Sequence, residues 1–375
     1  MKNNQPGSIT NHFSNITDPR DLNKRHKFID IITIAICAVV CGANSWEHIQ
    51  VFGQAKFDWF KDFLDLPHGI PSHDTFGRVF AQIDPDEFQQ SFMSWVQAIC
   101  QLSHGQVIAV DGKTLRRSHD KSNGKSAIHM VSAWASDNGI VLGQVKTDEK
   151  SNEITAIPEL IKTLEIEGCI VTIDAMGCQK NIAKTITDRG ADYVLALKEN
   201  QSTLHDNVEL FFQDYLNSAT NQSALDFYQS TDGDHGRIEI RKYWTTSDIN
   251  WLQGKESWKN INTIGMVQRE RHVGDDISVE TSYYISSIEN DAKRFGHAVR
   301  SHWGIENSLH WVLDVSFRED ESRIRKDNAP QNVAVLRHMA LNLLRSETSL
   351  KKSVKSKQLR AGWDNDYLAK ILKNA

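Results

Sequence analysis

Residues 106–147 read QVIAVDGKTLRRSHDKSNGKSAIHMVSAWASDNGIVLGQVKT, and this stretch decides the fold of the chain. Three runs of largely apolar residues, at 106–112, 127–136 and 140–147, predict three strands. The sequence Asp-Asn-Gly at 137–139 predicts a tight turn between the second and third strands. The stretch therefore predicts an antiparallel meander at the start of a sheet.

The residues that follow alternate between helical and extended patterns. Residues 152–166 and 179–190 predict helices, while the apolar runs 169–175 and 192–198 predict buried strands. Strands that alternate with helices usually pair in parallel, because the helix carries the chain back along the sheet. The sequence thus predicts an α/β fold whose core is a mixed sheet covered by helices.

The segment before this core predicts helices. Its most apolar run, residues 28–43, is shorter than the roughly 20 residues that cross a bilayer, so we interpret it as a buried helix. Ser72 or Asp74, and Asp84 or Asp86, are suitable caps for two further helices. A helical scaffold is one interpretation of this region and a helix-turn-helix reader of DNA is another.

The chain as a whole predicts a cytoplasmic protein. It has 375 residues with a net charge of −5, and its first residues lack the apolar segment of a secretory signal. We expect no membrane association and a location near the nucleoid. The five cysteines form no CxxC pair, which argues against a zinc knuckle or a disulfide framework.

Changes in hydrophobic pattern and charge along the chain suggest five parts. Residues 200–290 contain alternating segments typical of strands, and helical periodicity returns after them. Residues 337–373 carry nine Lys and Arg against three acidic residues, which indicates a solvated face or a tail that contacts phosphates. The predicted parts are a helical domain at 1–100, the first part of the core at 101–199, a β-rich insertion at 200–290, the second part of the core at 291–346 and a basic tail at 347–375.

Three carboxylates are the candidate catalytic and metal-binding residues. Asp111 and Asp174 each follow an apolar strand, and Glu306 lies in the predicted helix SHWGIENSLHW at 301–311. Either aspartate alone is as easily a turn or helix cap. Three carboxylates at one end of a sheet would suit Mg²⁺, with Mn²⁺ as a substitute, and a pair of such ions can promote phosphoryl transfer.

The motifs VDGKTLRRS, TIDAMGCQ, YVLALKENQ, DHGRIEIR and HWGIENSLHWVLDVSFRED together resemble the ISAs1-type insertion-sequence transposases, also called H-repeat-associated proteins. The resemblance covers nearly the whole chain. It implies a DDE transposase with a ribonuclease-H-like core, in which Asp111, Asp174 and Glu306 are the metal-binding acids. Val299, His302 and Leu313 stand where the related IS4-like group has Tyr, Arg and Lys, and Arg300 or His302 could take over the phosphate contact.

Basic residues close to these motifs are the candidate DNA contacts, although each is also compatible with an ordinary solvated surface. Trp303 and Trp311, on either side of Glu306, are expected to pack in the core. The predicted DNA-binding residues are Lys113, Arg116, Lys198, His235, Arg237, Arg241, Arg300 and His302.

The resemblance implies metal-dependent cleavage of DNA at the inverted-repeat ends of an element, followed by strand transfer into target DNA. Joining two ends suggests a homodimer or a higher oligomer on DNA. Two alternatives remain open from the sequence. One is a relative that binds element ends without cutting them, and the other is a structure-specific nuclease with the same core.

Overall fold

The computed structural model describes residues 9–21, 24–119, 124, 126–147, 153–217, 225–234 and 236–373. Its centre is a nine-stranded sheet with the order β3-β2-β1-β4-β5-β9-β8-β7-β6. The neighbours β1 and β4, and β4 and β5, are parallel, whereas all other neighbours are antiparallel. The strands are β1 Val107–Thr114, β2 His129–Ala135, β3 Ile140–Lys146, β4 Ile170–Ile173, β5 Asp192–Leu197, β6 Asp226–Asp234, β7 Arg237–Thr246, β8 Thr263–Val273 and β9 Asp276–Ser286.

The first five strands confirm the predicted ribonuclease-H-like mixed sheet. The antiparallel meander β1 to β3 is present, and Gly139 in the turn before β3 has a φ of 66°, a left-handed conformation that glycine adopts without strain. Helices α7 (Glu153–Thr163) and α8 (Lys180–Asp188) connect the parallel strands, as expected. The sequence pattern was sufficient here because each strand has buried residues on both of its faces.

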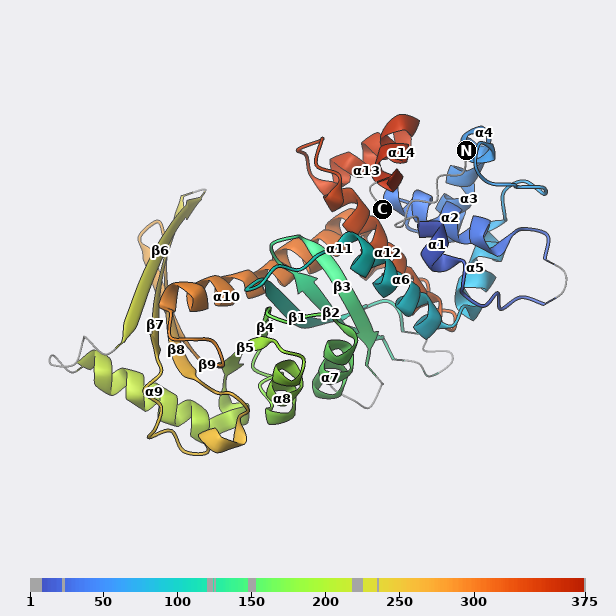
Figure 1. Ribbon diagram of the computed structural model, residues 1–375. Coiled ribbons are helices and arrows are strands. Elements are labelled where there is room, and N and C mark those ends of the chain that lie inside the picture. The colour runs from blue at the N-terminus through green and yellow to red at the C-terminus, as the bar shows by residue number, and fades with distance from the viewer. Residues whose placement is uncertain are drawn as a thin grey trace.

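Helices cover both faces of the central strands (Figure 1). On one face, Ile108 and Val171 belong to the same buried cluster as Ile157 of α7 and Ile182 of α8. On the other face, Val107 packs in a second cluster that includes residues of α10 (Ala292–Gly304). Successive residues of a strand point to opposite faces, so this alternation holds the sheet between two layers of helices.

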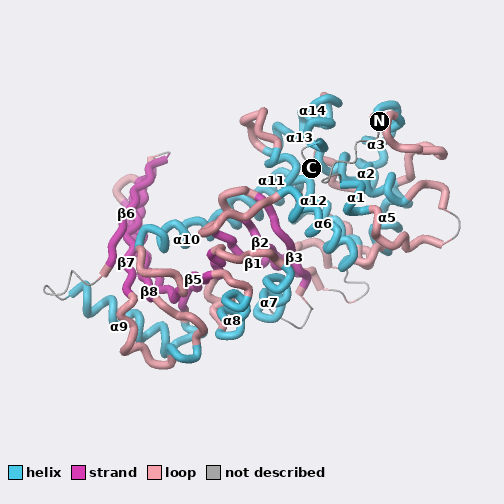
Figure 2. Tube along the Cα trace, viewed as in Figure 1, coloured by secondary structure: helices cyan, strands magenta, loops and turns pink. Residues whose placement is uncertain are grey.

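Residues 200–290 contribute α9 (Ser202–Asn217) and strands β6 to β9. These strands do not form a sheet of their own, because β9 pairs with β5 from Val194 opposite Ser286 to Leu197 opposite Tyr283. Strand β6 was not predicted, since its sequence DFYQSTDGD is mostly polar and gains its extended form by pairing with β7. Figure 2 shows that the four strands extend the core sheet to one side, where α9 also lies.

Helices gather at the opposite end of the molecule (Figures 1 and 2). Ser72 and Asp84 cap α5 and α6 as predicted, since Ser72 accepts a hydrogen bond from the amide of Thr75, and Asp84 accepts hydrogen bonds from the amides of Asp86 and Glu87. None of the helices in the described part of the chain is long and apolar enough to cross a membrane. The N-terminal helices are α1 Ile9–Phe13, α2 Phe28–Val40, α3 Trp46–Ala55, α4 Phe57–Lys61, α5 His73–Gln82 and α6 Pro85–Ile99.

The C-terminal segment is folded against this helical end. Helix α12 (Ala329–Ser346) packs against α2, α5, α6 and β3, and it is followed by α13 (Val354–Trp363) and α14 (Asn365–Lys373). Some cations of the basic stretch 337–373 lie inside the protein, since Arg337 is 3% exposed and Lys357 donates hydrogen bonds to the carbonyls of Leu344 and Glu347. These two side chains therefore form neither a solvated face nor a phosphate-binding tail. The proposed five-part division of the chain stays a prediction.

Candidate active site at the end of the parallel strands

Asp111 and Asp174 are brought side by side by the register of two parallel strands. Strands β1 and β4 pair up to Val110 opposite Ile173, so the next residue on each strand is an aspartate. Asp111 does not end its strand, contrary to the sequence prediction. Strand β1 continues to Thr114 because β2, on its other side, remains paired with it. The two aspartates thus mark the point at which β1 and β4 separate.

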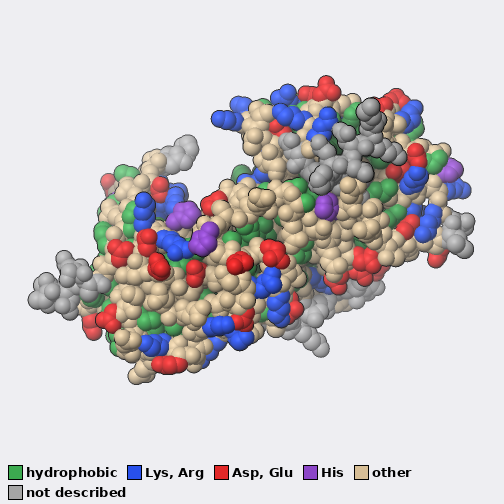
Figure 3. Space-filling model, in the orientation of Figure 1, with side chains coloured by type: hydrophobic (Ala, Val, Ile, Leu, Met, Phe, Trp, Pro, Cys, Tyr) green, Lys and Arg blue, Asp and Glu red, His purple; other side chains and the backbone are tan. Residues whose placement is uncertain are grey.

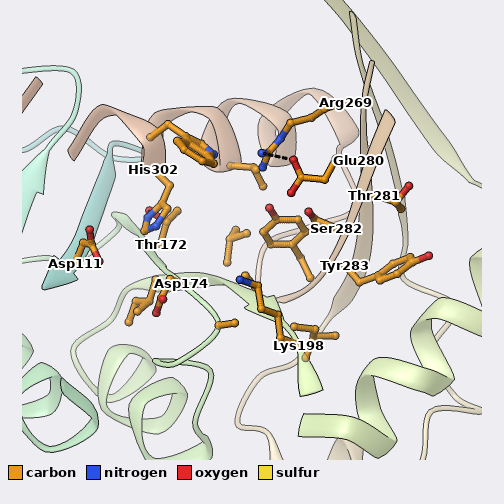
Figure 4. Close-up of a pocket in the computed structure, with 18 of the residues that line it drawn as sticks. Asp111, Thr172, Asp174, Lys198, Arg269, Glu280, Thr281, Ser282, Tyr283 and His302 are labelled. Atoms are coloured by element: carbon orange, nitrogen blue, oxygen red, sulfur yellow. Dashed lines mark hydrogen bonds and ion pairs between the residues drawn. The ribbon is translucent and has the colours of Figure 1, made fainter. Parts of the chain in front are cut away.

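Asp174 combines the two roles that were weighed for it. Its Oδ1 accepts hydrogen bonds from the amides of Met176 and Gly177 at 3.1 and 3.2 Å, which is the turn-capping role. The carboxylate also lines a pocket of about 430 Å³, where Asp111 and Glu306 are found as well. The turn therefore fixes the Asp174 side chain in the pocket that the other two acids also line, and Figure 4 shows Asp174 and Asp111 at one end of it.

Glu306 comes from an irregular part of the helix that follows the insertion. The helix is α10 up to Gly304, a π-helical segment at Ile305–His310, and α11 (Trp311–Phe317). The amide of Trp311 donates to the carbonyl of Glu306, five residues earlier. Such π-helical turns are rare and often occur at functional sites. The helix predicted at 301–311 is therefore interrupted by a π-helical turn at Glu306.

The pocket is electrostatically unfavourable for anions unless a cation is present. Burial, opposed by a hydrogen bond from the amide of Gly112 and reinforced by the nearby carboxylates of Glu153, Asp174 and Glu306, raises the pKa of Asp111 to about 7. The acids suit a divalent cation, since its charge would offset this repulsion and carboxylate oxygens are its preferred ligands. The arrangement is open, because among the described residues only His205, Asp206 and Glu209 bring three potential ligand atoms within 4.8 Å of one another.

Glu153, at the start of α7, is a member of this group that the sequence did not reveal. Its Oε1 lies 2.6 Å from His129 Nε2 on β2. The pair crosses directly over Gly112, where an added Cβ would come within 2.2 Å of the Glu153 oxygen and 2.3 Å of the His129 nitrogen. A side chain after Asp111 would therefore have to displace the ends of Glu153 and His129, and glycine lets this pair lie directly against β1.

His310 approaches the same aspartate from the π-helical segment. Its Nδ1 lies 3.6 Å from Asp111 Oδ2. Burial, together with the ammonium group of Lys113, lowers the pKa of His310 to about 4. The imidazole is neutral at pH 7, so this contact is polar and is not an ion pair.

Lys113 and Arg116, two predicted DNA contacts, lie in an ion-pair network. The ammonium of Lys113 binds Asp314 and lies 2.9 Å from Glu319 and 3.6 Å from Asp320, with a side chain only 12% exposed. Arg116 is exposed and its Nε lies 3.2 Å from Asp320. Because a phosphate would have to displace three carboxylates, Lys113 is better described as a structural cation that joins β1 to the helix carrying Glu306.

Two other predicted residues, Lys198 and His302, line the pocket itself. Lys198 follows β5 and is exposed. His302 Nδ1 lies 3.1 Å from the Thr172 hydroxyl, and burial lowers its pKa, so its ring is neutral at pH 7. Figure 4 places His302 beside Thr172, between the two aspartates and the strands of the insertion.

The insertion supplies a cation that the sequence interpretation missed. Arg269 of β8 lines the pocket and lies 3.6 Å from Glu280 of β9, as Figure 4 shows. Its guanidinium also lies 5.0 Å from the ring centre of Trp303. The alternation of side chains along β8 predicts that Arg269 lies on one face of the sheet. Only the pairing of β9 with β5 places that face next to the acids.

Two of the remaining predicted contacts, Arg237 and Arg241, lie on β7 of the insertion. His235 lies outside the described residues. Arg237 is exposed and 4.0 Å from Glu239, whereas Arg241 contacts both Asp232 and Glu239 at 2.5 Å. Both arginines belong to the strand that pairs with β6.

Arg300, on α10, pairs with Asp232 of β6 at 2.9 Å. It does not line the pocket in the described part of the chain.

The expectation that Trp303 and Trp311 pack in the core is wrong, because they are 48% and 60% exposed. The π-helical turn between them buries Ile305 and Leu309 against the core instead.

The molecule has a broad hollow on the side of α10. Figure 3 shows it between strands β6 to β9 and helices α13 and α14, with Lys, Arg and His side chains on the side of the strands. Cations and carboxylates are mixed on this side of the hollow, as the ion pairs of Arg241 and Arg269 with acidic residues of the same strands illustrate.

Comparisons with known proteins agree with this geometry. Residues 102–343 match the family model described as "Transposase DDE domain", and residues 10–96 match the model described as "DDE_Tnp_1-associated". The chain is 43% identical to "Putative transposase YncI" of Escherichia coli O157:H7, over 97% of this chain and 94% of that protein. It is 40% identical to "H repeat-associated putative transposase YhhI" of E. coli K12, over 97% of both chains.

Among solved structures, the chain is similar to the one described as "Cryo-EM structure of piggyBac transposase synaptic complex with hairpin DNA (SNHP)". The two share 11% sequence identity with a TM-score of 0.42, over 94% of this chain and 73% of that chain.

Proposed function

The chain belongs to the DDE transposases, together with the H repeat-associated proteins, and on this premise we propose that it cuts DNA at the inverted-repeat ends of its own element and joins the freed 3′-hydroxyl to target DNA. The observation that carries the proposal is the juxtaposition of Asp111 and Asp174 in a pocket shared with Glu306. The match to the family model shows that the chain is a transposase. We propose in addition that it cleaves and joins DNA with the help of a divalent metal ion.

Asp111 and Asp174 would hold Mg²⁺ or Mn²⁺ between them, with Glu306 completing the ligand set from the helix. When bound, divalent ions would activate the attacking oxygen. They would also neutralise charge on the phosphate and on the leaving oxygen. In their absence the Asp111 carboxyl, with a pKa of about 7, holds a proton that cation binding has to displace. We therefore expect the affinity for Mg²⁺ to fall as the pH decreases below 7.

The surrounding side chains would position the DNA. Lys198 and Arg269 supply positive charge in the pocket and would contact phosphates on either side of the scissile bond. The neutral ring of His302 could donate a hydrogen bond to a phosphate oxygen through Nε2 if the Thr172 hydroxyl donates to Nδ1. Arg116, Arg237, Arg241 and Arg300 stay predicted DNA contacts outside the pocket. A homodimer or higher oligomer would form when two ends are joined.

The test is a cleavage and joining assay on a labelled duplex that ends in the inverted repeat flanking the gene. Wild type, Asp174→Asn and the surface control Asp214→Asn are compared with Mg²⁺, with Mn²⁺ and with EDTA. We expect nicking at the element end and joining to target DNA, both dependent on the metal and lost only in Asp174→Asn.

Two results would overturn the proposal. Binding of end DNA by the wild type without cleavage in either metal would identify a protein that binds ends only. Metal-dependent cleavage of branched DNA without any joining would identify a structure-specific nuclease.

A further inference from the structure

A second concave surface lies outside the pocket of the acids, between α5 and the segment that leads into α12. It is a groove of about 890 Å³, and we call it the α5 groove. Its cations are Arg78 on α5 and Arg323, Arg325 and Lys326 on the segment before α12. The carboxylates among its lining residues are Asp74 and Asp327, so positive charge predominates.

Most of these cations are available to a ligand. Arg78, Arg323 and Lys326 are exposed, and no carboxylate elsewhere in the described ranges forms an ion pair with any of the three. This contrasts with Lys113 and Arg241, each of which is bound by at least two carboxylates. A cluster of unneutralised guanidinium and ammonium groups in one hollow is the arrangement expected for phosphate recognition.

The walls of the groove are held together by buried hydrogen bonds. The side-chain amide of Asn332, at the start of α12, donates to the carbonyls of Phe80 and Ile83 at 2.9 and 3.1 Å. Trp46 stacks on Phe80 with ring centres 5.4 Å apart, and an added Cβ at Gly77 would lie 3.3 Å from the indole. These contacts hold the two walls of the groove in fixed positions, so its shape does not depend on a single loop.

The groove is also connected to the acids through β1. Arg325 Nε donates to the carbonyl of Arg117 at 2.8 Å, and Arg117 lies six residues after Asp111. At about 3.3 Å per residue, six residues span at most about 20 Å. One turn of duplex DNA is about 34 Å long, so a duplex whose phosphate lies at Asp111 could reach the groove within a single turn.

From this geometry we propose that the α5 groove binds the phosphate backbone of duplex DNA on one side of the cleavage site, with Arg78 and Arg323 as its main contacts. The inference rests on the proposed function, since it takes DNA as the substrate, and it adds a binding surface that is separate from the catalytic pocket. The groove reads no sequence, because its role is to set the position of the duplex relative to the acids.

The test compares Arg78→Gln/Arg323→Gln with Arg78→Lys/Arg323→Lys, which keeps the charge, and with Lys162→Gln/Lys184→Gln, which removes two exposed cations from α7 and α8. Binding to end DNA and to a scrambled duplex is measured in EDTA between 50 and 300 mM salt. The Gln variant should lower the slope of log K against log salt by about two and weaken binding roughly 30-fold at 150 mM salt. The loss should be equal for both duplexes and absent from the two other variants.

Cleavage in Mg²⁺ at saturating protein separates this inference from the proposed function. The Gln variant should still cut through the intact acids, at a lower rate than the wild type because the groove no longer positions the duplex. Unchanged affinity and salt slope in the Gln variant, or an equal loss in the Lys162/Lys184 control, would overturn the groove as a DNA contact even if the wild type cuts and joins DNA. If the wild type binds with the expected slope and cuts nothing in either metal, the proposed function fails and the groove stands.

Discussion

Asp111→Asn should stabilise the protein in the absence of divalent cations and abolish DNA cleavage. The Asp111 side chain is 18% exposed and shares its surroundings with the carboxylates of Glu153, Asp174 and Glu306, so burial and repulsion raise its pKa from 3.8 to about 7. Asparagine has nearly the same shape but carries no charge. The substitution therefore removes the repulsion and also removes a proposed cation ligand.

The size of the effect follows from the pKa. A rise from 3.8 to about 7 means that ionising Asp111 costs the folded protein about 4 kcal/mol at pH 8. Between pH 4 and pH 7 the folded protein holds the proton and the unfolded chain does not, so the free energy of unfolding falls as the pH rises through this range and is constant above it. For a chain of 375 residues, 4 kcal/mol corresponds to a gain of roughly 5 °C in the unfolding midpoint.

The assay is thermal unfolding at pH 5 and pH 8, with EDTA or with Mg²⁺, for wild type, Asp111→Asn and the exposed control Asp214→Asn. In EDTA the Asp111 variant should exceed the wild type by roughly 5 °C at pH 8 and by about 2 °C at pH 5. Mg²⁺ should raise the midpoint of the wild type more than that of the variant. Equal midpoints at pH 8 in EDTA, or an equal effect of Mg²⁺ on both proteins, would refute the electrostatic reasoning.

Three further substitutions test the surroundings of the site. Gly112→Ala should shift the chain beside Asp111, because its Cβ would collide with Glu153, and should lower the cleavage rate about 100-fold without loss of duplex binding in EDTA. Lys113→Met leaves Glu319 buried without its main partner and should lower the free energy of unfolding in urea by about 3–5 kcal/mol, which Lys113→Met/Glu319→Gln should partly restore. Lys198→Gln should reduce the salt slope of DNA binding by about one, whereas Lys198→Arg should leave it unchanged, and an unaltered slope in the Gln variant would exclude a phosphate contact.

Much of the core was predictable because each of its strands is a short apolar run between turns. Either aspartate alone would have been interpreted as a turn or helix cap, and it was the presence of Glu306 as a third acid that pointed to a metal site. That the two aspartates lie side by side could not be predicted, because it depends on the register of β1 and β4, which the sequence does not contain. Strand β6 escaped prediction because its mostly polar sequence has no strand pattern of its own.

The surroundings of the acids were less predictable because they depend on contacts between distant segments. Lys113 was expected to face DNA, but its partner Glu319 is 206 residues away along the chain. Trp303 and Trp311 were expected in the core because large aromatic residues usually are, yet the π-helical turn directs Ile305 and Leu309 inward in their place. A helical pattern read at α-helical spacing does not anticipate such a turn.

The sequence by itself determined the mixed sheet, the capped helices and the positions of three acids, because local propensity, hydrophobic alternation and capping act over a few residues. Only the tertiary structure decided which charged groups are available. It neutralised Lys113 and Arg241 with carboxylates, brought Arg269 to the pocket through the pairing of β9 with β5, and left the cations of the α5 groove unpaired within the described chain. The physical reason is that charges interact through space, so their state depends on neighbours that only the folded chain brings together.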